Sequence, residues 1–587
     1  WLSEPDYADF VPEIEALVLG EDLDELEDAF RTQLEFGTGG IRGKMGPGPN
    51  RINPRTIGAA AQGLARYIQK SGGTRLAEGG VAIAFDTRAN SERFARETAA
   101  ILAGNGVVSH IFPGCRSTPE LSFAVRELGA AAGVVISASH NPPTDNGFKA
   151  YWTDGGQVVP PHDRNVIAEV QAVDRIDRAD YEQAASKGTI RVLGAEIDRA
   201  YHERLAGISL SDERDVCIVY TPLHGVGATS VVPALQVLGF ADLHLVEEQA
   251  IQDGGFPTVA GGVANPEDPA ALTLAVRKAA QVDADIAMAS DPDADRLGCA
   301  LPHPECGWDA APEDLVLNGN QIGVVLCHYL LDRKADRGEL PEDGVVAKTI
   351  VTSDLTAIVA RSFGVDVVDN LLVGFKYIGE VIKRLPQGST FLYGTEESHG
   401  YLVDAFVRDK DAATAAILLA ECAAGLKARG RTIRQYLDNI YKEHGYFREI
   451  QRSVSRPGAS GSREIQQIMQ HLRGSPPLEI GRHPVVEVID RLTGEAINPR
   501  TGARRAVDGA EGDVIVFTFT EAGQTRVTAR PSGTEPKIKY YVSAGSTDHP
   551  HLLGDDLGGT KKAVDGLAEE ILKGMVDVAE AAIAAER

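Results

Sequence analysis

Short apolar segments alternate with helix-like segments along the first third of the chain, and this pattern is what most restricts the fold. Apolar runs at 81–85 and 133–137 enclose helix-like segments at 92–104 and 119–129. Such alternation is typical of a mostly parallel sheet whose strands are joined by helical crossovers. The pattern restarts twice further along the sequence, so we expect three similar α/β domains.

The order of predicted elements changes near residue 447, where several strand-like runs follow one another before a terminal Ala-rich helix. This order predicts a smaller α+β domain. A chain of 587 residues is also too long for one hydrophobic core. The Gly- and Ser-rich segment 456–462 is expected to be a flexible junction to the last domain. We therefore predict four domains, three of them α/β and the last α+β: 1–212, 213–312, 313–446 and 447–587.

The net charge of −26 argues against a nucleic-acid partner, because binding to a phosphate backbone requires a clustered basic surface. A small phosphorylated substrate is compatible with this charge, since screening allows a local pocket of Arg and Lys on an acidic protein. We expect no membrane partner, because the sequence shows no window of ~18 apolar residues and no signal-like N-terminus. The six cysteines form no Cys-x-x-Cys pair, so neither a disulfide framework nor a zinc site is indicated and a cytoplasmic location is favoured.

The stretch GVVISASHNPPTDNGFKAY begins as an apolar strand and stops abruptly at the Asn-Pro-Pro sequence. Ser139 and His140 therefore lie at the carboxyl end of a predicted strand. In open α/β sheets this edge is where ligands bind. The alternative is a loop in which both side chains only form hydrogen bonds to the local backbone.

A second strand end carries the sequence SDPDADR, which places Asp291, Asp293 and Asp295 within five residues. Two such carboxylates repel each other by ~4 kcal/mol at ~4 Å and an effective dielectric constant of ~20, unless a cation neutralises them. Ligation by oxygen alone favours Mg²⁺ or Mn²⁺. An EF-hand is excluded, because Arg296 and Pro302 stand where Gly and Glu are required. A solvated acidic turn remains the alternative.

The third polar loop is YGTEESHG, which follows the strand-like run TFLY. We expect Gly394 to form a turn and Glu396, Glu397 and Ser398 to form an exposed polar tip. Glu396 and Ser398 offer the acceptors and donors that neighbouring sugar hydroxyls need. A loop that is simply solvated is the alternative.

The fourth loop, ARPSGTEPKIKYY, has the chemistry of a phosphate-binding turn. Arg530 offers a planar fork of donors, and the turn Ser532-Gly533-Thr534 offers hydroxyls and backbone N–H groups. It is not a Walker loop. The nearest stretch, GTGGIRGKM, fits neither the Walker pattern nor Gly-x-Gly-x-x-Gly, so nucleotide binding is not supported.

Together with FGTGGIRGKMGPGPNRIN, LLVGFKYIG and SGTEPKIKYY, the four loops make the chain resemble the α-D-phosphohexomutase superfamily of phosphoglucomutases and phosphomannomutases. The resemblance extends over essentially the whole chain in the family's motif order. It points to the branch that also holds phosphopentomutases and glucose-1,6-bisphosphate synthases. The fold that it implies is three similar mixed α/β sandwich domains and a C-terminal α+β domain around a central cleft.

The resemblance also implies a role for each matching residue. Ser139 corresponds to the serine that is phosphorylated in the active enzyme, and its phosphate binds Mg²⁺ together with Asp291, Asp293 and Asp295. His140, Lys149 and Arg42 correspond to catalytic residues near the reacting phosphate. The remaining matches are to substrate-binding positions: Gly374, Lys376, Glu396, Ser398, Arg296, Arg530, Ser532, Gly533, Thr534 and Lys539.

The activity implied by the resemblance is the interconversion of a hexose 1-phosphate and a hexose 6-phosphate, with glucose as the preferred sugar. Phospho-Ser139 passes its phosphoryl group to the substrate and takes back the other phosphate from a 1,6-bisphosphate, so glucose 1,6-bisphosphate serves as intermediate and activator. Phosphomannomutase, phosphopentomutase and bisphosphate synthase activities remain alternatives, and either a monomer or a dimer is compatible with the sequence. A non-catalytic sugar-phosphate-binding regulatory protein is disfavoured, because the serine and the three aspartates are present.

Overall fold

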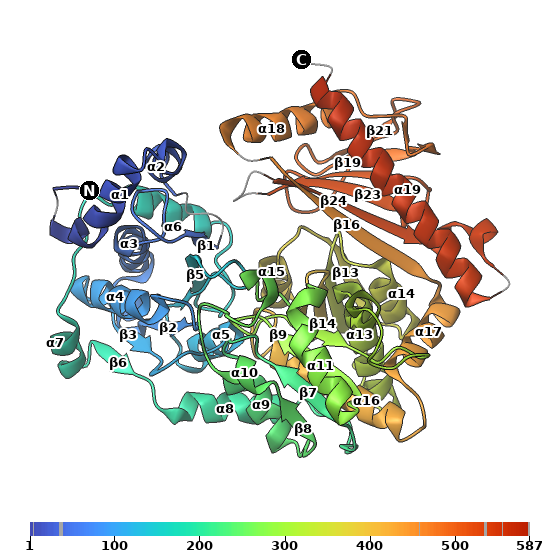
Figure 1. Ribbon diagram of the computed structural model, residues 1–587, viewed down its shortest axis with the longest axis horizontal. Helices are drawn as coiled ribbons and strands as arrows, with labels where there is room; N and C mark the ends of the chain where they lie inside the picture. Colours follow the sequence, from blue (N-terminus) through green and yellow to red (C-terminus); the bar gives the residue numbers. More distant parts are fainter. Residues whose placement is uncertain (4, 35–38, 457, 533–536, 555, 585–587) are drawn as a thin grey trace.

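The computed structural model describes residues 1–584 except 4, 35–38, 457, 533–536 and 555. Its strands form four large sheets that follow one another along the chain (Figure 1). We call the units built on these sheets domains I to IV. In Figure 1 domain I lies on the left, domains II and III lie at the lower right, and domain IV lies above domain III.

Domain I contains a six-stranded mixed sheet. In spatial order its strands are β1 (Gly40–Lys44), β5 (Asp145–Trp152), β4 (Ala132–Ile136), β2 (Val81–Phe85), β3 (Ser109–Ile111) and β6 (Ile190–Val192). Its helices are α1 (Val11–Leu19), α2 (Leu23–Phe30), α3 (Pro54–Gly79), α4 (Ser91–Gly104), α5 (Thr118–Glu127), α6 (His162–Gln171), α7 (Tyr181–Ser186) and α8 (Ala195–Ala206). β2 and β4 pair in parallel and are buried along their whole length, which explains their continuous apolar sequences. The strands and helices predicted from residue 81 to residue 137 are thus confirmed.

Domain II is built on a five-stranded sheet. In spatial order its strands are β11 (Val316–Leu317), β10 (Leu297–Ala300), β9 (Ile286–Ser290), β7 (Ile218–Thr221) and β8 (Leu243–Leu245). Its helices are α9 (Gly227–Val237), α10 (Glu247–Ala250), α11 (Thr273–Val282) and α12 (Pro312–Leu315). β9 pairs in parallel with β7 and antiparallel with β10, so the loop from β9 to β10 is a tight reversal at the carboxyl end of β9.

Domain III has a four-stranded sheet with the strands β13 (Asp366–Leu371), β12 (Gly344–Thr349), β14 (Thr390–Glu396) and β15 (Gly400–Val403) in spatial order. Its helices are α13 (Gly319–Asp336), α14 (Asp354–Ser362), α15 (Phe375–Arg384), α16 (Ala412–Lys427) and α17 (Ile433–His444). α16 also packs against α9 and β9, which ties domain III to domain II.

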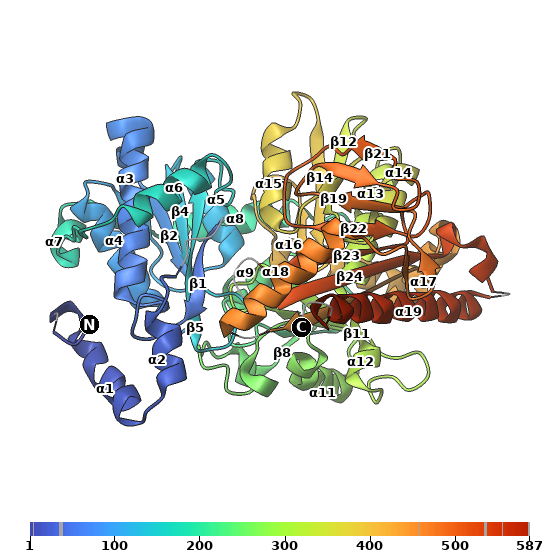
Figure 2. The same ribbon diagram turned by 90° about the horizontal axis from the view of Figure 1, so that it is seen from above.

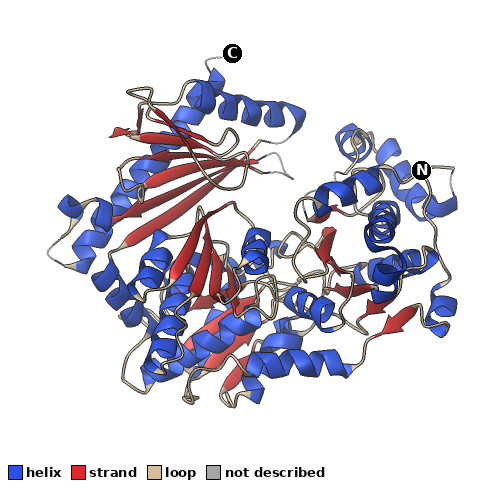
Figure 3. Cartoon of the chain, turned by 180° about the vertical axis from the view of Figure 1, so that it is seen from behind, coloured by secondary structure: helices blue, strands red, loops and turns tan. Residues whose placement is uncertain are grey.

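Domain IV is a seven-stranded antiparallel sheet with helices on one face (Figure 3). In spatial order its strands are β16 (Phe447–Ser455), β24 (Lys537–Gly545), β23 (Arg526–Pro531), β22 (Ile515–Thr518), β19 (Glu487–Asp490), β20 (Glu495–Ile497) and β21 (Arg504–Ala506). A two-stranded sheet, β17 (Glu479–Ile480) and β18 (His483–Pro484), and the helices α18 (Gly458–Gly474) and α19 (Leu557–Ala584) complete it. α18 packs against α19, and Figure 2 shows the two helices lying at an angle to each other. The prediction of consecutive strands followed by a terminal helix is therefore confirmed.

Two local predictions are wrong. The Gly- and Ser-rich segment is not the junction to domain IV, because β16 already belongs to the domain IV sheet and α18 begins at Gly458. The chain enters domain IV earlier, between α17 and β16. Gly394 is not a turn either, but lies inside β14. A side chain there would collide with Ile378 and Phe391, so glycine serves close packing.

In the described part of the chain, no helix is both long and apolar enough to cross a membrane.

Candidate functional site

The proposed nucleophile lies in the loop that follows β4. Ser139 has a φ of 53°, a left-handed conformation that is uncommon for residues other than glycine. Its N–H donates to Ser137 Oγ at 2.8 Å, and its own Oγ donates to Asp291 Oδ2 at 2.7 Å. The turn therefore directs the hydroxyl of domain I toward the acidic loop of domain II. Unusual backbone conformations of this kind cluster at functional sites.

Arg88, in the loop after β2, holds the Ser139 loop in shape. Its guanidinium is 3% exposed and donates to the carbonyl oxygens of Ser139 and Asn141 at 2.5 Å each. It also donates to the carbonyl oxygens of Pro142 and Asp145, at 2.6 and 3.0 Å. One buried cation thus binds four carbonyl groups of one loop, which limits movement of the serine.

The three aspartates of the second loop lie between β9 and β10. One carboxylate oxygen from each of Asp291, Asp293 and Asp295 lies within 4.8 Å of the others, and all three side chains are buried. Among the described residues, Asp293 Oδ1 and Asp295 Oδ1 have no hydrogen-bond partner although both are shielded from solvent. Burial, and then the neighbouring carboxylates, raises the pKa of Asp291 well above its usual range. Buried oxygens without donors in an all-carboxylate set fit a hard divalent cation, so this triad could bind a metal ion.

Two lysines compensate part of this negative charge. Lys149 Nζ, on β5, lies 2.5 Å from Asp293 Oδ2 and 3.6 Å from Asp295 Oδ2. Lys410 Nζ, from domain III, lies 2.8 Å from Asp295 Oδ2. Burial alone would raise the pKa of Asp293, but the ammonium group of Lys149 holds it below its usual range. Thr118 Oγ1 donates to Asp293 Oδ2 at 2.8 Å, so side chains from three domains meet at this loop.

His140 and Arg42 flank the serine. His140 Nδ1 lies 3.2 Å from Ser139 Oγ. Burial, and then the guanidinium groups of Arg296 and Arg42, holds the pKa of His140 well below its usual range, so the ring is neutral at pH ~7. Arg42, on β1, donates to Asn141 Oδ1 at 3.3 Å and is thereby kept beside the serine loop.

The proposed sugar-binding residues lie where β14 ends. Glu396 is the last residue of this strand and is 4% exposed, and Glu397 and Ser398 are half-buried, so the prediction of an exposed tip is wrong. The strand extends this far because it pairs with β12 on one side and β15 on the other. Burial raises the pKa of Glu396, and the nearby charges of Lys410 and Arg296 oppose this shift. Ser398 is half-buried in the turn after the strand. Arg296, which follows the aspartate loop, donates a hydrogen bond to Glu267 Oε1 at 2.7 Å.

At the proposed phosphate site, domain IV meets domain III. Arg530 lies on β23 directly opposite Lys539 of β24. Lys376 lies in the first turn of α15, after Gly374, which has a φ of 127°. Burial lowers the pKa of Lys376 to about 8; the carboxylate of Asp163 opposes this shift, and the positive charge of Arg530 adds to it.

The rest of this loop is only partly described. Ser532 N–H donates to the carbonyl oxygen of Lys537 at 2.8 Å. Burial lowers the pKa of Lys539, while the carboxylates of Glu267 and Glu397 oppose this shift. Two predicted residues lie outside the described part of the chain: Gly533 and Thr534.

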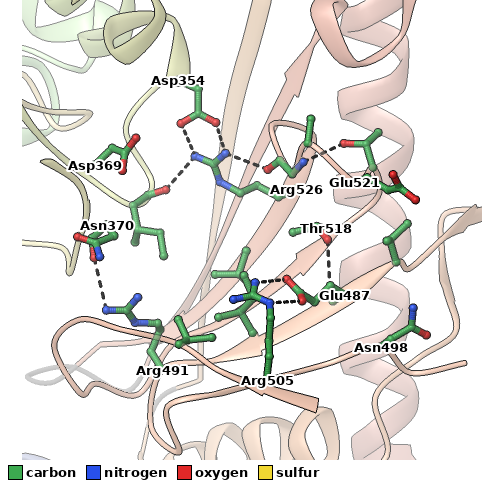
Figure 4. A pocket seen from close by; sticks show the side chains of 18 of the residues that line it. Asp354, Asp369, Asn370, Glu487, Arg491, Asn498, Arg505, Thr518, Glu521 and Arg526 are labelled. Carbon is green, nitrogen blue, oxygen red and sulfur yellow. Dashed lines mark hydrogen bonds and ion pairs between the residues drawn. The ribbon is translucent and has the colours of Figure 1, made fainter. Parts of the chain in front are cut away.

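Two cavities lie at domain boundaries. One of about 140 Å³ is lined by residues of domains II, III and IV, among them Glu267, Glu397 and Tyr541, and it adjoins the proposed substrate site. A larger one of about 680 Å³ lies between domains III and IV, where Asp354 faces Arg526 (Figure 4). None of the predicted site residues lines the larger cavity, so size alone does not locate the site.

Three family models match this chain, and together they cover most of it. They are described as phosphoglucomutase/phosphomannomutase α/β/α domains I, II and III, and they match residues 33–177, 199–304 and 318–444. The chain belongs to the phosphoglucomutase/phosphomannomutase family. The resemblance inferred from the four loops is thus confirmed.

Two similar relatives within this family are bacterial. A phosphoglucomutase of Staphylococcus saprophyticus is 35% identical over 526 residues, which cover 89% of this chain and 92% of the relative. A probable phosphomannomutase of Haemophilus influenzae is 36% identical over 505 residues, which cover 85% and 94% of the two chains.

Solved structures share the fold. A putative phosphomannomutase from Thermus thermophilus superposes with a TM-score of 0.63 at 22% identity and covers 92% of this chain and 99% of its own. The open form of the Paramecium phosphoglucomutase parafusin superposes with a TM-score of 0.64 at 16% identity and covers 94% and 96%. These likenesses confirm the predicted architecture of three α/β domains and a sheet-rich fourth domain.

Three residues of this arrangement were not found by sequence reasoning: Arg88, Thr118 and Lys410. Arg88 binds carbonyl groups and Thr118 begins a helix, so neither stands in a recognisable pattern. Lys410 has a weak local signal, because it lies in the alternating run Arg-Asp-Lys-Asp that follows β15. Its contact with Asp295 depends on the packing of domain III against domain II.

Proposed function

We propose that this family member is a Mg²⁺-dependent phosphosugar mutase that interconverts glucose 1-phosphate and glucose 6-phosphate. The observation that carries the proposal is the Ser139 hydroxyl, held 2.7 Å from Asp291 within a buried triad of aspartates. A phosphoryl group on this oxygen would stand at the metal-binding loop. The Staphylococcus relatives named phosphoglucomutase support glucose as the preferred sugar.

The proposed reaction has two phosphoryl transfers. In the first, the bond between phosphorus and Ser139 Oγ breaks and a bond forms to the free hydroxyl of the bound monophosphate, which loses its proton to a nearby base. The resulting glucose 1,6-bisphosphate turns around in the site. In the second transfer its other phosphate returns to Ser139 Oγ, and the isomeric monophosphate leaves. Lys149, Arg42 and His140 surround the serine and are the proposed catalytic groups.

Mg²⁺ would be held by Asp291, Asp293, Asp295 and a phosphoserine oxygen, and it supplies charge neutralisation for a phosphoryl group. The protein's own residues do the positioning. Arg88 fixes the serine loop through its carbonyl groups. Glu396 and Ser398 are proposed to bind sugar hydroxyls. The non-reacting phosphate is proposed to bind Arg530, Lys376, Lys539, Arg296, Ser532, Gly374, Gly533 and Thr534.

Two features of the structure support a substrate site shared between domains. The positive charge of Arg530 in domain IV contributes to the lowered pKa of Lys376 in domain III. Glu397 of domain III and Tyr541 of domain IV line the same cavity. A dianionic phosphate held by both domains would draw them together and exclude water, which a mutase requires to avoid hydrolysis of its phosphoserine. The proposal includes four domains with the boundaries 1–212, 213–312, 313–446 and 447–587. It also includes a cytoplasmic location and a monomeric or dimeric state.

The test is an assay of products. Purified protein is incubated with glucose 1-phosphate, Mg²⁺ and trace glucose 1,6-bisphosphate, and glucose 6-phosphate should form without net loss of the bisphosphate. The 1-phosphates of mannose, ribose and deoxyribose should have lower kcat/KM. Accumulation of bisphosphate only in the presence of an acyl phosphate donor would instead indicate a bisphosphate synthase. Failure to convert any of the four sugars would contradict the proposal.

A further inference from the structure

A second cluster of metal-ligand side chains lies far from the aspartate triad in sequence, where the chain leaves domain III. His328 on α13 and Glu443 and His444 at the end of α17 each place one ligand atom within 4.8 Å of the others. The donor set is two imidazole nitrogens and one carboxylate oxygen. Proteins use this set for Zn²⁺ and related transition metals, whereas Mg²⁺ prefers oxygen ligands.

His444 is the residue whose surroundings point to a ligand. Its side chain is 8% exposed, and its Nε2 is shielded from solvent with no hydrogen-bond partner among the described residues. Buried polar side-chain atoms are normally paired, so an unpaired imidazole nitrogen requires an explanation. The nearest acidic group is Glu443, whose Oε1 lies 3.7 Å from this nitrogen.

One ring nitrogen of His328 is already held by a hydroxyl group. Its Nδ1 lies 2.6 Å from the Tyr436 hydroxyl, which leaves Nε2 as the nitrogen available for ligation. The ring also packs edge-on against Phe363 and Tyr436. Histidines that bind metals usually have their second nitrogen fixed by an oxygen in this way.

Glu443 is the exposed residue of the cluster. Its side chain is 71% exposed, so it can move without disturbing the core and leaves a path for water and ions. Ligands bound at about 2.0–2.1 Å to a tetrahedral ion lie about 3.4 Å from each other. The separation of 3.7 Å between His444 and Glu443 needs only a small contraction to reach this value.

We propose that His328, Glu443 and His444 form a binding site for a Zn²⁺-type transition-metal ion, with water completing its coordination. His444 is followed by Gly445, whose φ of 95° starts the passage into β16. A bound ion would therefore tie α13 to the end of α17 and stabilise the start of that passage. The ion is separate from the Mg²⁺ of the proposed mutase reaction, and the inference does not depend on that reaction.

The experiment uses Co²⁺ as the probe on the full chain, with saturating Mg²⁺ present to occupy the aspartate triad. Calorimetry and the visible absorption of Co²⁺ should report a bound ion that Zn²⁺ displaces. His444→Gln and Glu443→Gln should each weaken Co²⁺ binding at least about tenfold. Glu443 is exposed, so Glu443→Gln should keep the melting temperature of the metal-free protein and the Mg²⁺-dependent activity.

The matched control addresses a rival cluster in domain II, made of Cys217, Asp242 and His244. His244 there already pairs with Asp242 at 2.7 Å, so His244→Gln should leave Co²⁺ binding unchanged. Loss of binding in His244→Gln, or unchanged binding in both His444→Gln and Glu443→Gln, would overturn the proposal. So would the absence of Co²⁺ binding to the wild-type protein when Mg²⁺ is present.

Discussion

Ser139 Oγ donates a hydrogen bond of 2.7 Å to Asp291 Oδ2, a residue 152 positions later in the chain and in another domain. The contact joins the proposed nucleophile to the proposed metal site before any substrate is bound. Substitution of Ser139 is therefore the first test of the proposed site.

Ser139→Ala should abolish turnover, because the phosphoryl acceptor is removed, and should leave substrate affinity within about tenfold. Steady-state kinetics and calorimetric binding of glucose 1-phosphate measure the two effects separately. Ser186→Ala, at an exposed serine of the same domain, is the control and should behave as wild type. Mutase activity retained in a clean Ser139→Ala preparation would exclude this serine as the nucleophile.

Asp293→Asn should weaken Mg²⁺ binding at least about tenfold, because it removes an anionic ligand from a buried set. Titration of activity with Mg²⁺ and direct binding by calorimetry check this expectation. Asp309→Asn, at an exposed acid of domain II, should leave the titration unchanged. An unaltered Mg²⁺ titration of Asp293→Asn would mean that the ion binds elsewhere.

The pKa of Lys376, about 8, predicts a pH dependence. Below this pH the side chain is charged and attracts the substrate phosphate, whereas above it the free enzyme carries a neutral amine. We expect kcat/KM to fall as the pH rises through about 8, since kcat/KM reports the free enzyme. Lys376→Arg should shift this decline to much higher pH, because arginine stays charged. Lys383→Arg, on the same helix, is the control; an unchanged pH profile in Lys376→Arg would remove Lys376 from the phosphate site.

Arg530→Ala should raise KM and lower kcat together, because a charge-assisted bond that helps to hold the closed state is lost. Such bonds contribute ~1.5 to 3 kcal/mol, which corresponds to roughly 10- to 100-fold in kcat/KM. Hydrolysis of the phosphoserine should increase, while Mg²⁺ affinity without substrate should stay the same. Arg505→Ala, which removes an exposed arginine paired with Glu487 in the same domain, is the control. Native kinetics of Arg530→Ala would show that domain IV does not bind the phosphate.

Arg526 of domain IV forms a two-pronged ion pair with Asp354 of domain III at the wall of the larger cavity (Figure 4). Lys348 Nζ lies 2.9 Å from the same carboxylate. Arg526→Ala removes one partner of a largely buried pair, so unfolding should become easier by roughly 3 kcal/mol and domain IV should become more susceptible to proteolysis. Denaturant titration and limited proteolysis measure this, with Arg504→Ala as an exposed control. Equal stability of the Arg526→Ala variant would mean that this contact does not hold the domains together.

Local sequence pattern was enough to predict the main strands and helices of the first domain and to place the candidate site residues at strand ends. The apolar run before Ser139 and the one before Asp291 are buried strands, because only continuous apolar segments can occupy a sheet covered on both faces. Polar loops that follow such strands must emerge at the carboxyl edge of the sheet. Local pattern was therefore sufficient to find Ser139, the three aspartates and the four-domain fold.

How these loops meet depends on contacts between domains, which the local sequence does not encode. Arg88, Thr118 and Lys410 contact the site through bonds between segments far apart in the sequence, which no local pattern encodes. Glu396 was expected to be exposed, but its strand pairs with a neighbour on both sides and it is buried. The pairing of Ser139 with Asp291, and the pKa of Lys376, likewise arise from burial and from charges in other domains, and these exist only once the domains have packed together.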